Sequence, residues 1–300
     1  MLVPQAAPRF LARAGIEHDE LRELEIEAMR RAAIACPSPA PPGSPSHDRC
    51  RSRPSQTATA ESPDLPGTLA WHRYNNRLMP VTRLLLVRHG ATTATEEGRF
   101  SGSTGVELSD QGRWQAARLG DRLAQQNITA IYSSPLSRAL DTARILADRC
   151  HVAPVTRDEL REIRHGRWEG LTREEVEAQF GDEYATWEAD PFTFAPSGGE
   201  SGVAVLARAL PVIRDMVTTH SGGQVLVVSH KATLRLVLSS LLGFDARGYR
   251  DRLDQSPACL NVVDFKDPVR ARLMLFNDTS HYEDRPRVPD QSLSKWWDRR

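Results

Sequence analysis

Two histidines and two arginines stand close behind short apolar runs of this sequence. Arg88 and His89 end the run LLLVRHG, and His230 follows QVLVV in a similar way. Arg138 comes soon after ITAIY, beyond two serines. A guanidinium group suits phosphate because its fork of N–H donors matches the phosphate oxygens. A single histidine after a strand is more often an ordinary loop residue, but two histidines and two arginines placed to converge point to a phosphate ligand.

These residues converge if the apolar runs are strands of one sheet. Five runs of strand length, RLLLV, ITAIY, QVLVV, LNVVDF and ARLMLF, are separated by helical stretches, which predicts an α/β sheet layered by helices. The first three runs do not alternate, as expected for strands that are buried on both faces. In open α/β sheets ligands bind beyond the carboxyl ends of the strands, which is where all four residues are expected.

Two helix starts can also be predicted. Ser134 followed by Pro135 is typical of an N-cap with proline at the first helical position, and the helix that follows would carry Arg138 in its first turn. Thr172 and Glu175, in TREE, are typical of a capping box at the start of another helix. The N–H groups of a helix N-terminus would add donors for a phosphate.

The composition limits the classes of function. Lys plus Arg and Asp plus Glu number 39 each in 300 residues, so the chain has no general positive field for nucleic acid or a membrane surface. No apolar run approaches the roughly 18–20 residues of a membrane span, and no signal-peptide core is found, so a cytoplasmic location is expected. The four cysteines are scattered, which favours free thiols over disulfides or a zinc site.

The chain before the first apolar run differs in character from the rest. Residues 36–66 are rich in Pro, Ser, Thr and Ala and predict a disordered linker, because they hold too little apolar surface to fold. Residues 17–35 predict a charged helix, either marginal or used for docking. Met79 precedes the first strand closely, so we treat residues 1–78 as an optional extension. The polar residues 283–300 predict a frayed tail or, through two adjacent tryptophans, a docking element.

Five motifs occur in order along the rest of the chain: LLLVRHGATT, SSPLSRALDTA, LREIRHGRWEGLT, SGGES and VLVVSHKATLR. Over residues 82–282 the chain resembles the histidine phosphatase superfamily, which includes phosphoglycerate mutase-like enzymes and broad-specificity phosphatases. RHG alone would be weak support, but five ordered motifs make coincidence improbable. The resemblance implies a three-layer α/β sandwich with a mostly parallel central sheet in residues 81–282, after an N-terminal extension over residues 1–80.

The resemblance also implies a mechanism. His89 would attack phosphorus and form a phosphohistidine, while Arg88 and Arg138 hold the phosphate oxygens. His230 would add a hydrogen bond to the same group, and Glu162 would give the leaving group its proton. The loop GRFSGSTG would close over the phosphate. The expected site residues are therefore His89, Glu162 and His230 for catalysis and Arg88, Arg138, Thr95, Ser103 and Thr104 for phosphate binding, with no metal ligand and no cofactor.

Three positions depart from the pattern of the family. Ala91 replaces a common glutamate, Thr95 replaces a common asparagine, and Lys231 replaces the glycine that usually follows the second histidine. None of these changes removes a chemical step. Lys231 adds either a positive charge or only a bulkier neighbour at the rim, and the charge could favour a more acidic substrate.

Other polar residues of the same motifs have structural alternatives to a catalytic role. Glu159, Arg161 and Glu169 are expected to be solvated or structural. His165 is expected to have a positional role. Glu200, in SGGES, is expected near the pocket, where it could hold the geometry of a loop.

The phosphatase reaction is favoured over the mutase reaction. W-E-G in RHGRWEGLT resembles the phosphatase branch, and the segment before SGGES is short for the substrate-binding insert of a mutase. We therefore predict a metal-independent phosphatase that hydrolyses small phosphomonoesters. Phosphoglycerate mutase-type phosphotransfer and a catalytically impaired binding protein stay open, whereas metal-dependent hydrolysis lacks a ligand motif such as H-E-x-x-H. The expected partner is a phosphorylated small-molecule metabolite, with no nucleic acid and no membrane, and a homodimer is left open.

Overall fold

The computed structural model describes residues 80–93 and 98–283. The helix, the linker and the optional extension expected before residue 79 lie outside the described residues. The same holds for Thr95 and for the tail after residue 283.

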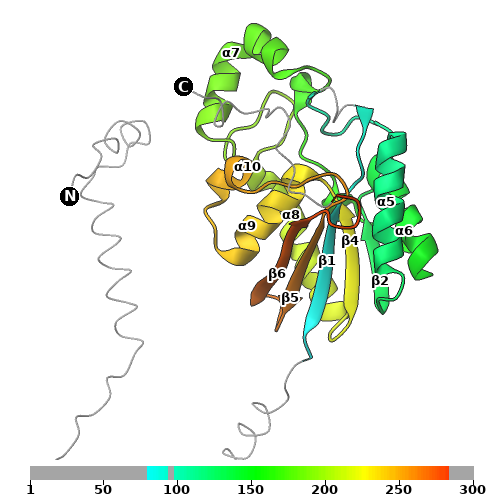
Figure 1. Ribbon diagram of the computed structural model, residues 1–300. Coiled ribbons are helices and arrows are strands. Elements are labelled where there is room, and N and C mark those ends of the chain that lie inside the picture. Colours follow the sequence, from blue (N-terminus) through cyan, green and yellow to red (C-terminus); the bar gives the residue numbers. More distant parts are fainter. Residues whose placement is uncertain (1–79, 94–97, 284–300) are drawn as a thin grey trace, which may run out of the picture. The chain divides into compact units, whose positions relative to one another are not determined.

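A six-stranded sheet forms the centre of the described chain, with strand order β3-β2-β4-β1-β5-β6 (Figure 1). The first four strands in the chain pair in parallel, and the last two are antiparallel. All five predicted strands form, and the mostly parallel α/β sheet is confirmed. The additional strand, β3, is too short to be recognised as an apolar run. The strands are β1 (Thr82–Arg88), β2 (Ile128–Ser133), β3 (Pro154–Thr156), β4 (Gln224–Ser229), β5 (Leu260–Phe265) and β6 (Ala271–Asp278).

Strand β1 lies in the interior of the sheet, between β4 and β5. Leu84 and Leu86 pack on one face and Leu85 and Val87 on the other, because successive side chains of a strand point to opposite faces. All four are buried, which explains why this run does not alternate with polar residues. Arg88, the last residue of β1, pairs in register with the last residue of β4, so both strands end at the same level.

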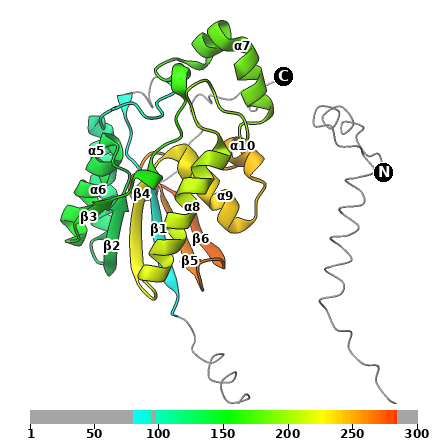
Figure 2. The ribbon, with the colours of Figure 1, turned by 180° about the vertical axis from the view of Figure 1, so that it is seen from behind.

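Helices cover both faces of the sheet and complete three layers (Figures 1 and 2). Helices α5 (Asp110–Leu123) and α6 (Ser137–Cys150) supply the apolar residues that pack on the face of Leu85 and Val87. Helices α8 (Gly202–Thr219) and α9 (Lys231–Leu242) cover the opposite face. The remaining helical segments are η1 (Asp158–Leu160), η2 (Gly166–Trp168), α7 (Arg173–Ala189), η3 (Ala246–Gly248) and α10 (Tyr249–Arg252).

Helix α6 begins later than the sequence predicts. Its N-cap is Leu136, whose side chain makes no capping bond, so the predicted N-cap at Ser134 with Pro135 as the first helical residue is wrong. The Ser134 hydroxyl accepts a hydrogen bond from the Leu136 N–H at 3.3 Å, but it also contacts a residue at the end of another strand, as described below. Arg138 still lies in the first turn of α6.

Helix α7 lies beyond the carboxyl end of β1 (Figure 1). It begins with the predicted capping box: Thr172 Oγ1 accepts from the Glu175 N–H at 3.2 Å, and the Glu175 carboxylate accepts from the Thr172 N–H at 2.8 Å. Its inner side packs on an aromatic cluster that includes Phe100 and Trp168. This small core holds the segments around residues 100 and 168 above the sheet.

Two smaller expectations can be compared with the described residues. Cys150 and Cys259 are free thiols, and burial raises the pKa of Cys259 to about 12, so this thiol stays protonated and unreactive. Within residues 80–93 and 98–283, no helix has the length and apolar content needed to cross a membrane.

Candidate active site

The residues singled out at the strand ends come together at the carboxyl edge of the sheet. The His89 N–H donates to the Ser229 carbonyl at 3.1 Å, which fixes the end of β1 against the end of β4. The imidazole rings of His89 and His230 lie with their centroids 5.1 Å apart. Arg88 and Arg138 are buried with them, although the two arginines come from different strand-helix units. The topology thus assembles four buried residues from three separate regions of the sequence.

His89 has one ring nitrogen free for chemistry. Its Nδ1 lies 2.7 Å from the Gly90 carbonyl oxygen. Because a carbonyl oxygen only accepts, Nδ1 must carry the proton, and Nε2 keeps its lone pair. Burial, and then the positive charges of Arg138 and Arg88, lower the pKa of His89 well below its usual value. At neutral pH the ring is therefore uncharged and nucleophilic.

His230 is held by Ser134, the residue that the sequence pattern predicts as a helix N-cap. Its Nε2 lies 2.7 Å from the Ser134 hydroxyl, and its ring is fully buried. Its Nδ1 is buried and makes no hydrogen bond with any described residue. Burial lowers the pKa of His230 well below its usual value, and the charge of Arg138 adds to this effect. The ring is thus neutral, with one nitrogen available to a ligand.

Backbone carbonyl groups fix the two arginines. Arg88 Nη1 donates to the Gln255 carbonyl at 2.7 Å, and Arg138 donates to the Thr104 carbonyl at 2.8 Å and the Gly102 carbonyl at 2.7 Å. The Nε atoms of both arginines are buried without a hydrogen-bond partner among the described residues. Carbonyl groups orient a guanidinium but do not neutralise its full charge. The site therefore contains two fixed cations with N–H donors to spare.

Glu162 lies at the same site, held by the first turn of α9. Its Oε1 accepts from the Ile163 N–H at 2.9 Å and from the Thr233 N–H at 3.1 Å, and its Oε2 accepts from the Ala232 N–H at 3.1 Å. A helix N-terminus favours an anion because its first N–H groups are unsatisfied. The negative charge of Glu162 also acts against the lowering of the Arg88 pKa by burial, which ties this carboxylate to the same cluster.

Arg208, which sequence reasoning missed, holds the segment that carries Glu162. Its Nη1 donates to the carbonyls of Glu159 and Arg161 at 2.6 and 2.9 Å, and its Nη2 donates to the Glu162 carbonyl at 3.2 Å. Its Nε donates to Glu200 Oε1 at 3.1 Å. No pattern in the sequence marks Arg208, because all three carbonyls lie far away along the chain. Glu200 holds this loop through Arg208.

The loop GRFSGSTG packs against the W-E-G segment. The Phe100 N–H donates to the Leu171 carbonyl at 3.0 Å, and the Ser103 N–H and hydroxyl both donate to Glu169 Oε1, at 2.9 and 3.0 Å. The Thr104 hydroxyl donates to the Ser101 carbonyl at 3.1 Å. Ser103 and Thr104 are exposed, and their side chains bond within the protein. The contribution of this loop that the structure shows is therefore the set of carbonyls that fix Arg138.

Three neighbours of the cluster have packing contacts of their own. Ala91 is buried against α5, where its N–H donates to Gln115 Oε1 at 3.0 Å. The ring of His165 packs edge-on against Phe100 with centroids 4.9 Å apart, and burial lowers its pKa. Arg161 forms an exposed ion pair with Asp158 at 3.3 Å. These contacts give the three residues structural roles at the edge of the site.

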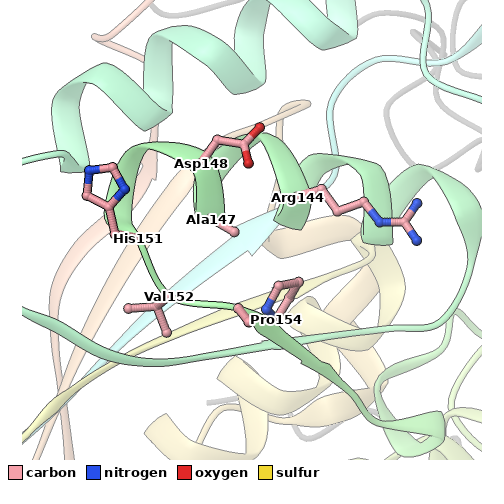
Figure 3. Close-up of a pocket in the computed structure, with 7 residues that line it drawn as sticks. Arg144, Ala147, Asp148, His151, Val152 and Pro154 are labelled. Atoms are coloured by element: carbon pink, nitrogen blue, oxygen red, sulfur yellow. The ribbon is translucent and has the colours of Figure 1, made fainter.

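A surface pocket lies elsewhere on the molecule. Its lining residues come from the last turns of α6 and the segment leading into β3 (Figure 3). Arg138 lies in the first turn of α6, so this pocket is at the opposite end of that helix. The residues that line the pocket are Arg144, Ala147, Asp148, His151, Val152, Ala153 and Pro154.

Across the described ranges, no group of three or more His, Cys, Asp or Glu side chains is arranged to hold a metal ion.

The sequence is similar to those of known phosphatases. Residues 84–279 match the Histidine phosphatase superfamily (branch 1). Phosphoserine phosphatase 1 of Hydrogenobacter thermophilus is 33% identical over 165 residues, which cover 55% of this chain and 78% of that protein. Glucosyl-3-phosphoglycerate phosphatase of Mycolicibacterium vanbaalenii is 39% identical over 173 residues, which cover 55% of this chain and 76% of that protein.

A solved structure agrees with the sequence matches. The native structure of a mycobacterial glucosyl-3-phosphoglycerate phosphatase superimposes with a TM-score of 0.61 and 30% identity, covering 66% of this chain and 99% of that one. The family match over residues 84–279 contains the whole buried cluster at the carboxyl edge of the sheet. The chain therefore belongs to the histidine phosphatase superfamily, in its phosphatase branch, and is a phosphomonoester hydrolase.

Proposed function

We propose that the chain hydrolyses small phosphomonoesters without a metal ion, through a phosphohistidine formed on Nε2 of His89. The observation that carries this proposal is the bond from His89 Nδ1 to the Gly90 carbonyl, which leaves Nε2 unprotonated in a buried, positively charged site. Around it, three buried nitrogens have no hydrogen-bond partner among the described residues: Nε of Arg88, Nε of Arg138 and Nδ1 of His230. Three oxygens of a phosphoryl group would satisfy such a set of donors.

In the first step, His89 Nε2 attacks phosphorus and the bond to the ester oxygen breaks. Arg88 and Arg138 stabilise the charge on the equatorial oxygens. The positive charge that develops on the His89 ring is stabilised through the Nδ1–H bond to the Gly90 carbonyl. For His230 to donate through Nδ1, its Nε2 must accept the proton of the Ser134 hydroxyl, and the 2.7 Å contact allows this arrangement.

Glu162 must be protonated when the substrate binds, and it then supplies the proton that the leaving oxygen needs. Oε1 already accepts from two N–H groups and from the Thr233 hydroxyl at 3.2 Å, whereas Oε2 accepts only from the Ala232 N–H. We therefore assign the transferred proton to Oε2. In the second step the ionised carboxylate takes a proton from water, which attacks phosphorus. The N–P bond then breaks, phosphate leaves, and both side chains return to their starting states.

The natural substrate is proposed only as a class. The relatives are named for phosphoserine and for glucosyl-3-phosphoglycerate, which supports a small phosphorylated metabolite as the substrate of this chain. The cytoplasmic location, the absence of a nucleic-acid partner and the homodimer stay predictions from the sequence.

Trapping the covalent intermediate tests the mechanism. The purified full chain, treated with EDTA, is expected to hydrolyse p-nitrophenyl phosphate, and a quench in alkaline detergent is expected to recover an acid-labile, base-stable phosphoryl group on the protein. His89→Asn is expected to abolish both the label and turnover. His151→Asn is a matched control, because His151 lies at the far end of α6.

Four results would contradict parts of the proposal. Loss of activity with EDTA that zinc or magnesium restores would reject the metal-free reaction. Unchanged turnover by His89→Asn would reject the nucleophile. Transfer of phosphate to a second phosphoglycerate faster than its release to water would favour the mutase reaction, and binding of phosphate without turnover would indicate an impaired binding protein.

A further inference from the structure

A second group of charged side chains lies beside Arg88, and the mechanism above does not use it. Lys231 Nζ is 3.3 Å from Asp254 Oδ1, and Arg235 Nη2 is 2.8 Å from the same oxygen. We call these three residues the rim cluster. Asp254 directly precedes Gln255, whose carbonyl group holds Arg88. Asp254 of the rim cluster is therefore the chain neighbour of the residue whose carbonyl group holds Arg88.

The rim cluster carries more positive than negative charge. Although burial acts in the opposite direction, the charges of Lys231 and Arg235 lower the pKa of Asp254 to about 2, so this carboxylate is ionised at neutral pH. Among the described residues, Asp254 is the one carboxylate that forms an ion pair with Lys231 or Arg235. Arg235 also has a buried Nε without a hydrogen-bond partner among the described residues. With both cations charged, one positive charge is in excess.

Lys231 belongs to the helix turn that holds Glu162, the proposed proton donor to the leaving group. It directly follows His230 and begins the first turn of α9, whose N–H groups hold the Glu162 carboxylate. Glu162 protonates the leaving oxygen in the proposed reaction, so this helix turn borders the leaving group. The Lys231 side chain is 42% exposed, whereas Arg88 is buried. Lys231 can therefore reach a part of the substrate that lies outside the phosphate pocket.

Resting on the proposed function, we propose that the rim cluster binds a carboxylate on the leaving group, so that preferred substrates are phosphomonoesters of hydroxy acids. The excess of one positive charge matches a carboxylate, with its single negative charge, better than a second phosphate. Lys231 supplies the accessible donor, while Asp254, which is paired with Arg235, holds its ammonium group in place. Lys231 is thus a residue that determines specificity, distinct from the residues that hold the transferred phosphate.

The charge state of Lys231 gives the preference a dependence on pH. Although part of the Lys231 side chain is exposed, burial of its ammonium group beside the protein surface, and then the charges of Arg235 and Arg88, lower the pKa of Lys231 to about 7, against the opposing effect of Asp254. Only the protonated ammonium attracts a carboxylate. The preference is therefore greatest below pH 7 and declines as pH rises above it, because the lysine loses its charge.

Two esters that differ at one group test the inference. 3-Phosphoglycerate carries a carboxylate where glycerol 3-phosphate carries a hydroxymethyl group, and their phosphates titrate alike. The measured quantity is the ratio of kcat/KM for the two esters. We expect the wild-type ratio to exceed one and to fall between pH 6 and pH 8.5. In Lys231→Met it should fall by about tenfold and lose this pH dependence, since a hydrogen bond to a charged group is lost.

Lys266→Met is the matched control, because Lys266 is exposed on the strand end away from the site. This variant should keep the wild-type ratio at every pH. A wild-type ratio at or below one, or a Lys231→Met ratio equal to that of the wild type, would overturn the inference while leaving the proposed phosphatase intact. Failure of the wild type to hydrolyse either ester while it hydrolyses p-nitrophenyl phosphate would also overturn the inference. Failure with p-nitrophenyl phosphate as well would reject the proposed function, and the inference with it.

Discussion

The rings of His89 and His230 lie at the ends of two adjacent parallel strands, with centroids 5.1 Å apart and planes tilted by 58°. Both are buried between two arginines, and burial and these positive charges lower both pKa values. The pairing of β1 with β4 fixes this distance, because Arg88 and Ser229 are register partners and each precedes one of the histidines. The two neutral rings form the centre of the site.

The first prediction concerns stability against pH. In the unfolded chain each histidine takes up a proton near pH 6.5, whereas in the folded protein both stay neutral to a much lower pH. The free energy of unfolding should therefore decrease as pH falls below 6.5 and be unaffected by these groups above it. Each histidine contributes up to about 1.4 kcal/mol per pH unit in that window.

Urea unfolding in phosphate-free buffers between pH 7.5 and 5 measures this dependence. The slope of the unfolding free energy against pH should be smaller in His89→Gln than in the wild type. The difference should correspond to at most one proton taken up on unfolding, whatever the change in absolute stability. Parallel profiles for the two proteins would mean that His89 is protonated in the folded state.

The second prediction separates the two roles of Glu162. With an alkyl phosphate, Glu162→Gln should lower kcat by roughly 10²–10⁴-fold, because an alkoxide leaves poorly without a proton. p-Nitrophenolate leaves without help, so the first step should survive with p-nitrophenyl phosphate while the second step lacks its base. Rapid mixing should then show a burst of p-nitrophenol close to the enzyme concentration.

Glu159→Gln changes a carboxylate of the same segment and should show neither effect. A Glu162→Gln enzyme without a burst would reject the role of Glu162 as the base of the second step.

The third prediction assigns Arg208 a positioning role. Arg208→Met removes the bonds to three carbonyls around Glu162 and leaves the Glu200 carboxylate without this partner, which should cost about 2 kcal/mol of stability. If Arg208 acts by placing Glu162, kcat should fall about tenfold for an alkyl phosphate and much less for p-nitrophenyl phosphate. Arg214→Met changes an exposed arginine of the same helix and serves as the control. Equal losses with both substrates would show that the effect is only structural.

The fourth prediction concerns the loop GRFSGSTG, which contains Gly102 and Gly105. A Cβ atom at Gly102 would lie 2.5 Å from Glu169 Oε1 and 2.6 Å from the Ile163 carbonyl oxygen, whereas a Cβ at Gly105 would meet nothing within 4 Å. Gly102→Ala should therefore destabilise the protein by about 1–3 kcal/mol, as overpacking does. It should also raise KM, because the Gly102 carbonyl that fixes Arg138 is displaced. Gly105→Ala should be close to neutral in thermal unfolding and in KM, and equal effects of the two variants would contradict this account.

Sequence patterns were sufficient for the main strands and for the residues at their ends. An unbroken run such as LLLV is buried on both faces, and the residues after it must lie at the carboxyl edge of a parallel sheet. The capping box at Thr172 is also local, since both its bonds join residues three positions apart. The start of α6 was predicted wrongly because Ser134 has a partner on another strand, and that partner is not visible in local sequence.

Local sequence patterns predict the set of chemical groups and their places at the ends of strands, because strand periodicity and motif order are local properties. The tertiary structure decided how those groups are held. Arg208 fixes the Glu162 segment from more than 40 positions away, Ser134 orients His230, and Ser103 bonds to Glu169. These contacts depend on which strands are neighbours and on how the loops pack above them, and such long-range contacts leave no periodic pattern in the chain.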